Sequence, residues 1–263
     1  MKKRTAFLLA LILSAAISVS PVPGDDAAGE YDYETESTGH SAGLIDISSI
    51  PAGDTIDLLQ LSAAEVDACF QAYPIEEGDA VYERIEGRSF DPYGEIGLSD
   101  LRYLKVLHYN FDGEVQVGEL IVNAYLAEDF LTAFKQLFSE RYQIEKMHLI
   151  DDYWQGDGDS SDHASIDVNN TSAFCYRTTT SGSSLSNHAF GCAIDINPQQ
   201  NPYIYGDGGV AHANAEAYVD RNSGLPHVIT HEDTCYRIFT DLGFTWGGDW
   251  ESVKDYQHFE KTF

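Results

Sequence analysis

Two short segments, far apart in the chain, carry the residues best suited to chemistry. The first, residues 186–198, contains His188 and Asp195, and the second, near the C-terminus, contains Asp255 and His258. The residues between His188 and Asp195 include a glycine, so the chain can turn and bring an imidazole and a carboxylate together. Two histidines and one carboxylate form the donor set of a catalytic zinc site, with a fourth position left for water. A buried histidine–aspartate hydrogen bond would use the same residues, and composition alone leaves that alternative open.

The other histidines and a cluster of aspartates have no comparable setting. His40 lies in the acidic N-terminal segment, and His163 and His212 lie in polar segments expected to be loops. The other four have no acidic or histidine partner at an evident ligand spacing: His108, His148, His227 and His231. We expect surface or structural roles for all seven. Asp157, Asp159 and Asp162 resemble a calcium loop in composition, but the full spacing and the downstream glutamate are missing. We therefore expect these aspartates to lie in a solvated loop.

The two segments form a longer paired pattern, S-x-H-x-x-G-x-A-x-D-I-N-P followed near the C-terminus by D-x-x-H-F-E. This pattern resembles the D-alanyl-D-alanine carboxypeptidase family of zinc metallopeptidases. It is most similar to the branch that contains the phage-type L-alanyl-D-glutamate endopeptidases. The resemblance is sharpest over residues 169–201 and 246–260, and extends more loosely through residues 118–123 back to about residue 50.

The resemblance implies a role for each matching residue. His188, Asp195 and His258 match the zinc ligands of the family. Asp255, three residues before the last ligand, matches the general base, which would move a proton from water to the leaving amine.

Two further residues match positions upstream of the first ligand. Arg177 matches the arginine that steadies the substrate carbonyl, a role suited to a permanently charged guanidinium. Ser186 matches a site serine that orients a ligand or touches substrate. As a surface residue, Arg177 would instead form an ordinary salt bridge.

Several elements are expected to position these residues. Apolar residues at helical spacing predict helices over residues 63–73 and 127–142. Strand-forming runs at residues 101–109 and 115–122 flank Asp112-Gly113, which indicates a β-hairpin.

The segments around the paired pattern are shorter. Residues 144–150, 174–177 and 193–196 are expected to form strands, and the polar residues 151–170 a long surface loop. Thr230 is expected to cap a helix that ends at Gly243. Helices and hairpin strands without regular β-α-β alternation predict an α+β fold, a small antiparallel sheet flanked by helices. The resemblance implies the zinc peptidase core that the family shares with the hedgehog signalling domain.

The N-terminal part predicts export and a domain organisation. Lys2, Lys3 and Arg4 precede an apolar run, Ala6–Val19, that is short for a membrane span. Residues 1–24 are therefore expected to be a signal peptide or an uncleaved N-terminal anchor. Residues 25–49, acidic and without hydrophobic period, are expected to be a disordered linker, and residues 50–263 the peptidase domain. The protein would then be extracellular or held at the cell envelope.

Charge and cysteine content narrow the class of protein. A formal charge of −28 argues against nucleic acid as a partner, because phosphates attract basic proteins. Four cysteines in an exported chain permit two disulfides in any of three pairings. They are Cys69, Cys175, Cys192 and Cys235, and their spacing does not match a thiolate zinc site.

The sequence favours a zinc-dependent peptidase that hydrolyses peptidoglycan stem peptides next to a D-amino acid. Whether it is a carboxypeptidase or an endopeptidase, and which bond it cuts, stays open. One alternative is a non-catalytic, zinc-containing module that binds the cell wall or a peptide. Another is a structural or signalling protein with a similar zinc site. No protein partner is inferred.

Overall fold

The computed structural model describes residues 45–179, 182 and 184–262, all within a unit that begins at Gly43. The predicted signal peptide and residues 25–44 of the predicted linker lie outside the described residues. The fold begins earlier than the predicted boundary at residue 50. Asp46 caps a 3-10 helix at Ile47–Ser49, and Ile47 is buried in the main core. Residues 45–49 therefore belong to the domain because Ile47 gains burial there.

A three-stranded antiparallel sheet forms the N-terminal half of the domain. Its strands β1 (Gln71–Pro74), β2 (Leu101–Tyr109) and β3 (Val115–Asn123) are ordered β1-β2-β3. In the β2–β3 hairpin, Leu101 pairs with Asn123 and Tyr109 with Val115. Gly113 has φ 80° in the connecting turn, a conformation that glycine adopts at little cost. The predicted hairpin is confirmed.

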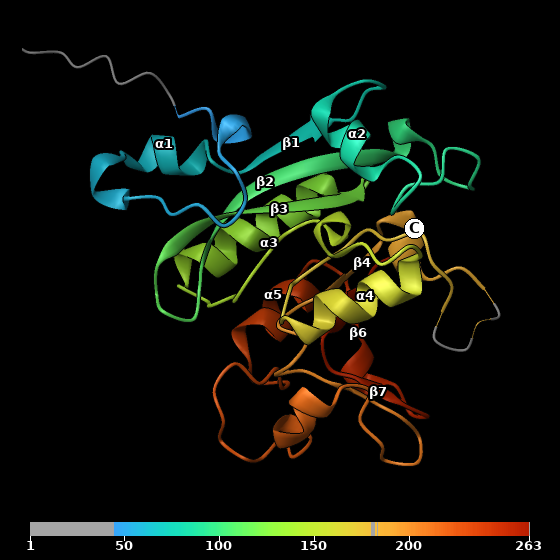
Figure 1. The fold of residues 1–263 in the computed structure, drawn as a ribbon. Coiled ribbons are helices and arrows are strands. Elements are labelled where there is room, and N and C mark those ends of the chain that lie inside the picture. The colour runs from blue at the N-terminus through green and yellow to red at the C-terminus, as the bar shows by residue number, and fades with distance from the viewer. Residues whose placement is uncertain (1–44, 180–181, 183, 263) are drawn as a thin grey trace, which may run out of the picture. The chain divides into compact units, whose positions relative to one another are not determined.

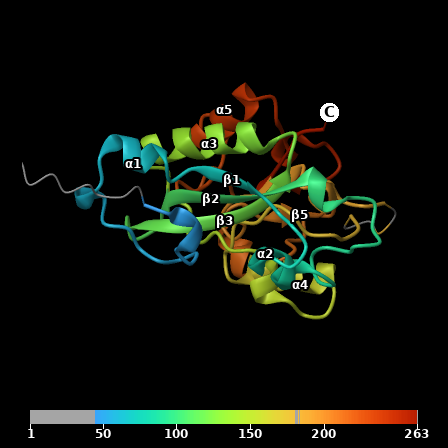
Figure 2. The same cartoon turned by 90° about the horizontal axis from the view of Figure 1, so that it is seen from above.

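Helices cover both faces of this sheet, as Figure 2 shows. Along one face runs α3 (Ala127–Ser139), which buries Phe130, Phe134 and Leu137. On the other side lie α2 (Ala80–Ile85) and α4 (Gly158–Asp167). Because both faces are covered, β2 and β3 are buried almost continuously rather than at alternate residues. The helix predicted over residues 127–142 is confirmed, ending three residues earlier.

The C-terminal half adds two small sheets and a helix (Figure 1). Strands β4 (Ala193–Asp195), β8 (His258–Glu260) and β6 (Thr245–Trp246) form an antiparallel sheet in the order β4-β8-β6. A ribbon pairs β5 (Tyr203–Ile204) with β7 (Lys254–Asp255). The helix α5 (Thr234–Asp241) lies beside α3. The α+β class with small antiparallel sheets is confirmed.

Aromatic packing joins the two halves. The ring of Phe130 on α3 meets the rings of Phe239 and Phe244, with centroids 6.4 and 5.1 Å apart. Phe259 on β8 stacks on Phe239 with centroids 4.9 Å apart. The sheet that carries the paired pattern therefore packs on the same core as the N-terminal sheet.

Several local predictions were wrong. The helix predicted over residues 63–73 is shorter: α1 spans Ala63–Asp67, and the chain then enters β1, where it pairs with β2. Residues 144–150 form one isolated bridge, between Lys146 and Asn170, rather than a strand, although Ile144 and Met147 are buried. Apolar residues can thus fill a core without a ladder partner. The helix near residue 230 begins at Asp233, which accepts a hydrogen bond from the backbone N of Cys235.

The polar segment at residues 151–170 is not a surface loop. A 3-10 helix at Ile150–Tyr153 leads into α4, which Asp157 caps by accepting from the backbone N of Ser160 at 2.8 Å. Residues 174–177 likewise form no strand. The sequence of α4 has almost no apolar period, so the cap was its main signal.

The four cysteines are buried and free, so the expected disulfides are not formed. Each thiol contributes to packing as a small apolar group. Within the described residues no helix is long and apolar enough to cross a bilayer.

A buried ionic network ties α2 to β3. Glu119 lies on β3 and accepts two hydrogen bonds from the Arg84 guanidinium, at 2.7 and 2.9 Å. It also accepts one from the hydroxyl of Tyr103 at 2.5 Å. Burial disfavours the charge of Glu119, but these partners outweigh it and hold the pKa of the carboxyl below its usual value of 4.5.

We predict that Glu119→Gln destabilises the fold and makes its free energy of unfolding depend less on pH in the acidic range. A depressed carboxyl pKa contributes stability that is present above the unfolded-state pKa and is lost as pH falls through the folded-state pKa. The substitution should cost roughly 2–4 kcal/mol near neutral pH, because it removes the buried charge that faces Arg84 and leaves the guanidinium with only the more exposed Asp152. Urea unfolding at about pH 7 and about pH 3 measures both effects. The control is Glu140→Gln at an exposed position; equal losses in both variants would contradict the prediction.

Candidate metal and catalytic site

The pairing of β4 with β8 brings two of the predicted ligands together. Asp195 and His258 lie directly opposite each other in the register of the two strands. An Asp195 carboxylate oxygen is 3.1 Å from Nδ1 of His258. Directly opposed residues in antiparallel strands have adjacent side chains, so backbone pairing alone positions this pair.

The third predicted ligand comes from a short turn before β4. His188 lies in a 3-10 helix at Asn187–Phe190, where Ser186 caps the turn by accepting from the backbone N of His188. Nε2 of His188 is 3.2 Å from Nδ1 of His258 and 3.4 Å from a carboxylate oxygen of Asp195. The structure thus brings the three residues together, each about 5% exposed or less.

Gly191 holds this turn against the N-terminal sheet. It adopts φ 65°, and its carbonyl accepts a hydrogen bond from the backbone N of Asn123 at the end of β3. A Cβ at this position would lie 2.5 Å from that same nitrogen. The glycine of the paired pattern is therefore needed both for its φ and for the close approach to β3.

The far sides of both imidazoles have partners that orient them. Nδ1 of His188 faces the carbonyl oxygen of Ala173, and Nε2 of His258 lies 3.0 Å from the Glu260 carboxylate. A nitrogen that donates a proton outward leaves the other ring nitrogen with its lone pair directed inward. Glu260 is itself fixed by the amide of Asn187 at 2.7 Å. Such outer partners are typical of metal-binding histidines.

The distances between the donor atoms fit a zinc ion. Ligand atoms about 2.0–2.1 Å from a tetrahedral zinc stand roughly 3.3 Å apart. The nitrogen–nitrogen separation is 3.2 Å and the two nitrogen–oxygen separations are 3.1 and 3.4 Å. His188, Asp195 and His258 form one of the groups in the described residues whose donor atoms could hold a metal ion.

The electrostatics of the cluster favour a cation at its centre. Burial opposes the charge of Asp195, yet the adjacent His188 and His258 hold the pKa of the carboxyl well below its usual range. Burial lowers the pKa of His258, but Asp195 and Glu260 outweigh it and raise the pKa to about 10. Without a metal, the cluster therefore keeps a proton.

Asp255 is buried close to this cluster on β7. Burial and the neighbouring Asp195 raise the pKa of its carboxyl to about 8, whereas His258 and Arg177 act in the opposite direction. Its Oδ1 has no hydrogen-bond partner within the described part of the chain. Gly247 packs so closely that a Cβ there would lie 2.6 Å from the Asp255 carbonyl oxygen. The backbone thus holds a carboxyl group with an unpaired oxygen beside the cluster.

Arg177 reaches the site from a position before the 3-10 helix. Its guanidinium forms an ion pair with Asp162 on α4 at 3.0 Å, and both side chains are mostly buried. Burial lowers the pKa of Arg177, but Asp162 and the other acidic groups around it together outweigh burial, so the guanidinium stays charged. Its Nε has no hydrogen-bond partner among the described residues.

All six predicted site residues line one cavity of about 740 Å³. Tyr203, Tyr205 and Trp250 add aromatic walls, and the Trp250 ring lies 5.2 Å from the His258 ring. The cavity is large enough for a short peptide segment. The hydroxyl of Ser186 lies in its wall while it caps the turn of His188.

One residue of the site escaped the sequence analysis. Asp162 was assigned to a solvated loop, but it lies on α4 and pairs with Arg177. The available signal was Asp157, which can cap a helix, followed by Ser160 three residues later. The contact of Glu260 with His258 has a clearer signal, because residues two apart on a strand share a face.

Comparison with known proteins finds a family match in the C-terminal segment. Residues 179–261 match the family model described as D-alanyl-D-alanine carboxypeptidase. The resemblance predicted from the sequence is confirmed over this segment. No curated protein and no solved structure gave a significant match.

The matched segment contains Ser186, His188, Asp195, Asp255 and His258, whereas Arg177 lies just before it. The match supports a peptidase with a D-alanyl-D-alanine carboxypeptidase-like domain. The roles of the individual site residues stay predictions, now accompanied by their geometry.

We predict that Gly191→Ala destabilises the domain much more than Gly224→Ala. Both glycines have positive φ, at 65° and 71°, so both variants pay the backbone cost of about 1 kcal/mol. Only Gly191 meets backbone atoms, which should add roughly 1–3 kcal/mol. Thermal unfolding monitored by circular dichroism measures the difference. Equal shifts in melting temperature would show that the contact with β3 does not constrain the turn.

Proposed function

We propose that the protein is a zinc-dependent peptidase that hydrolyses peptidoglycan stem peptides at a bond next to a D-amino acid. The observation that carries the proposal is the buried group of His188, Asp195 and His258, with donor atoms 3.1–3.4 Å apart. The family match over residues 179–261 supports the reaction class.

The residues of the cavity supply the roles that peptide hydrolysis needs. Zinc bound by His188, Asp195 and His258 would polarise the scissile carbonyl and lower the pKa of a water molecule. Asp255, with its unpaired oxygen, takes the proton from that water and passes it to the leaving amine. A nearby cation would favour the ionised carboxylate that this base requires.

The second role belongs to Arg177. Its guanidinium stabilises the negative charge that develops on the carbonyl oxygen. Because Asp162 anchors one side of the guanidinium, Arg177 is oriented before the substrate arrives. Ser186 contributes by fixing the turn that carries His188.

In this proposal the protein acts outside the cytoplasm. The basic residues and apolar run before residue 24 support export, by a cleaved signal or a retained anchor. The acidic segment up to residue 49 would then serve in part as a linker. A high negative charge suits a soluble protein that binds peptides rather than nucleic acid.

The first test separates an enzyme from a binding module. Asp255→Asn keeps the shape of the side chain but removes the base, so kcat should fall about 10²–10⁴-fold. Zinc content should stay the same, because Asp255 is not in the predicted ligand set. Zinc analysis together with hydrolysis assays gives both values. The control is Glu251→Gln at a nearby exposed position; unchanged hydrolysis in Asp255→Asn would remove Asp255 from the mechanism.

The second test identifies the bond. The zinc-loaded protein is incubated with purified muropeptides, with and without a chelator, and the masses of the products are determined by mass spectrometry. Loss of a terminal alanine, abolished by chelation and restored by zinc, is the result expected of a carboxypeptidase. An internal cut would indicate an endopeptidase. Intact muropeptides beside a zinc-loaded protein would favour the non-catalytic binding module.

A further inference from the structure

A second group of side chains that could hold a metal ion includes two residues of the same cavity wall, His163 and His212. It consists of His163, Asp167 and His212, whose donor atoms all lie within 4.8 Å of one another. His163 and Asp167 are four residues apart on α4, and His212 precedes a 3-10 helix at Ala213–Tyr218. Residues four apart on a helix share a face, so α4 presents its two side chains side by side.

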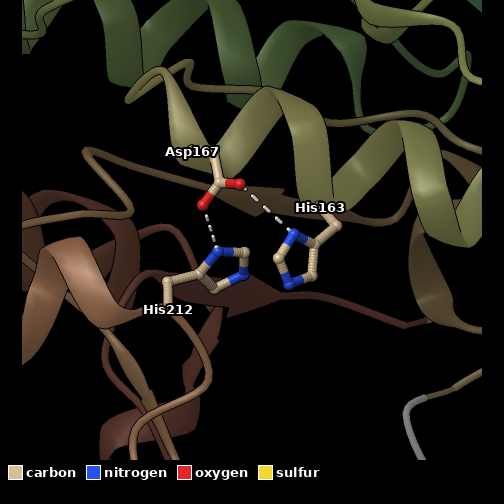
Figure 3. Close-up of side chains that lie close together, drawn as sticks. All are labelled: His163, Asp167 and His212. Atoms are coloured by element: carbon tan, nitrogen blue, oxygen red, sulfur yellow. Dashed lines mark hydrogen bonds and ion pairs between the residues drawn. The ribbon is translucent and has the colours of Figure 1, made fainter.

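Asp167 is the centre of this group, as Figure 3 shows. One of its oxygens lies 2.8 Å from Nδ1 of His212, and the other 3.5 Å from Nδ1 of His163. The two imidazole rings lie face to face at a tilt of 39°, with centroids 3.9 Å apart. Two imidazoles and a carboxylate are thus gathered at one point from two separate segments of the chain.

The group is held in place by contacts other than those among its own side chains. The backbone carbonyl of Asp167 accepts hydrogen bonds from the amides of Gln199 and Asn214, at 2.6 and 3.0 Å. His212 is only 7% exposed, so its ring has little freedom. The side chain of His163 is 59% exposed and can turn to complete a coordination shell.

We propose that His163, Asp167 and His212 form a second site for a divalent transition-metal ion, with zinc as the ion tested. Imidazole nitrogens with one carboxylate suit zinc and its neighbours, whereas calcium and magnesium prefer oxygen ligands throughout. The site has no ligand in common with His188, Asp195 and His258, and does not depend on the function proposed for them. Its half-exposed residues make it the outer of the two sites.

Charge sets this group apart from the other metal-like cluster of the domain. Glu119, His148 and Asp152 also lie close together, but the Arg84 guanidinium already pairs with both carboxylates there. By contrast, no lysine or arginine in the described part of the chain forms an ion pair with Asp167. The strongly acidic chain would attract cations to this outer site.

The test isolates the outer site by removing a residue of the inner one. His258→Ala should still bind one zinc ion per chain, measured by elemental analysis after dialysis. Adding His163→Ala to this variant should weaken zinc binding at least tenfold, since even outer partners of a ligand change affinity about 10–100-fold. Cobalt bound to His258→Ala should give a visible absorption band that the double variant lacks.

The matched control adds His231→Ala to His258→Ala. His231 forms an exposed pair with Asp249 at 2.7 Å but belongs to no group of three metal-binding residues in the described chain. Zinc and cobalt binding should be unchanged. Circular dichroism measures folding, and because the His163 side chain is exposed, His163→Ala is expected to fold.

Each outcome separates the outer site from the inner one. Wild-type protein with two zinc ions, of which His163→Ala and His258→Ala each remove one, supports both sites. A single ion lost only with His258→Ala would overturn the outer site and leave the proposed function intact. In that case His163, Asp167 and His212 are a hydrogen-bonded contact between α4 and the segment before residue 213. A single ion lost only with His163→Ala would instead overturn the inner site.

Discussion

The inward-facing lone pairs of His188 and His258 are the constraint on which the site depends. Both rings donate outward, to Ala173 and Glu260, so the nitrogens that face each other at 3.2 Å are both acceptors. The carboxylate of Asp195 adds a third acceptor to the same buried point. Three acceptors without a cation would repel one another, and burial prevents water from screening them. A proton or a metal ion must therefore occupy the centre for this arrangement to be stable.

The rest of the domain holds the three donor groups of His188, Asp195 and His258 around this centre. The β4–β8 pairing positions two of the three groups. The turn that ends at Gly191 positions the third, because it is hydrogen-bonded to β3. The N-terminal sheet thus acts as a platform, braced on one face by α3 and on the other by the Arg84–Glu119 network. Side chains held by regular backbone pairing lose little freedom when a metal binds, which favours tight binding.

The sequence predicted the parts of this design that depend on local pattern. Strand-forming runs on both sides of Asp112-Gly113 indicated the hairpin, and the period of residues 127–142 indicated α3, because each signal lies within one segment. The family resemblance brought together His188, Asp195 and His258, which no period could have linked. The predictions were wrong where tertiary packing determines the local structure. The run at residues 144–150 is apolar because it is buried, and α4 is polar because it lines a cavity instead of filling a core.

The predictions for the cysteines and for the aspartates of α4 were wrong for a related reason. Their chemistry depends on neighbours that are distant in sequence. Cys192 lies in the paired pattern and Cys69 follows α1, yet both are packed as apolar groups in the main core. Asp162 and Asp167 are indistinguishable from solvated acids until α4 turns one toward Arg177 and the other toward His212.

The cavity combines a segment with family likeness and a segment without it. The inner cluster lies entirely within residues 179–261, which match the family model. Asp162, His163 and Arg177 come from the chain before that segment and line the same cavity. In the proposed mechanism the inner cluster cleaves the bond, whereas a substrate is selected by the walls that it touches. Differences in specificity between this protein and others that match the family model are therefore expected to arise in α4 and the residues that follow it.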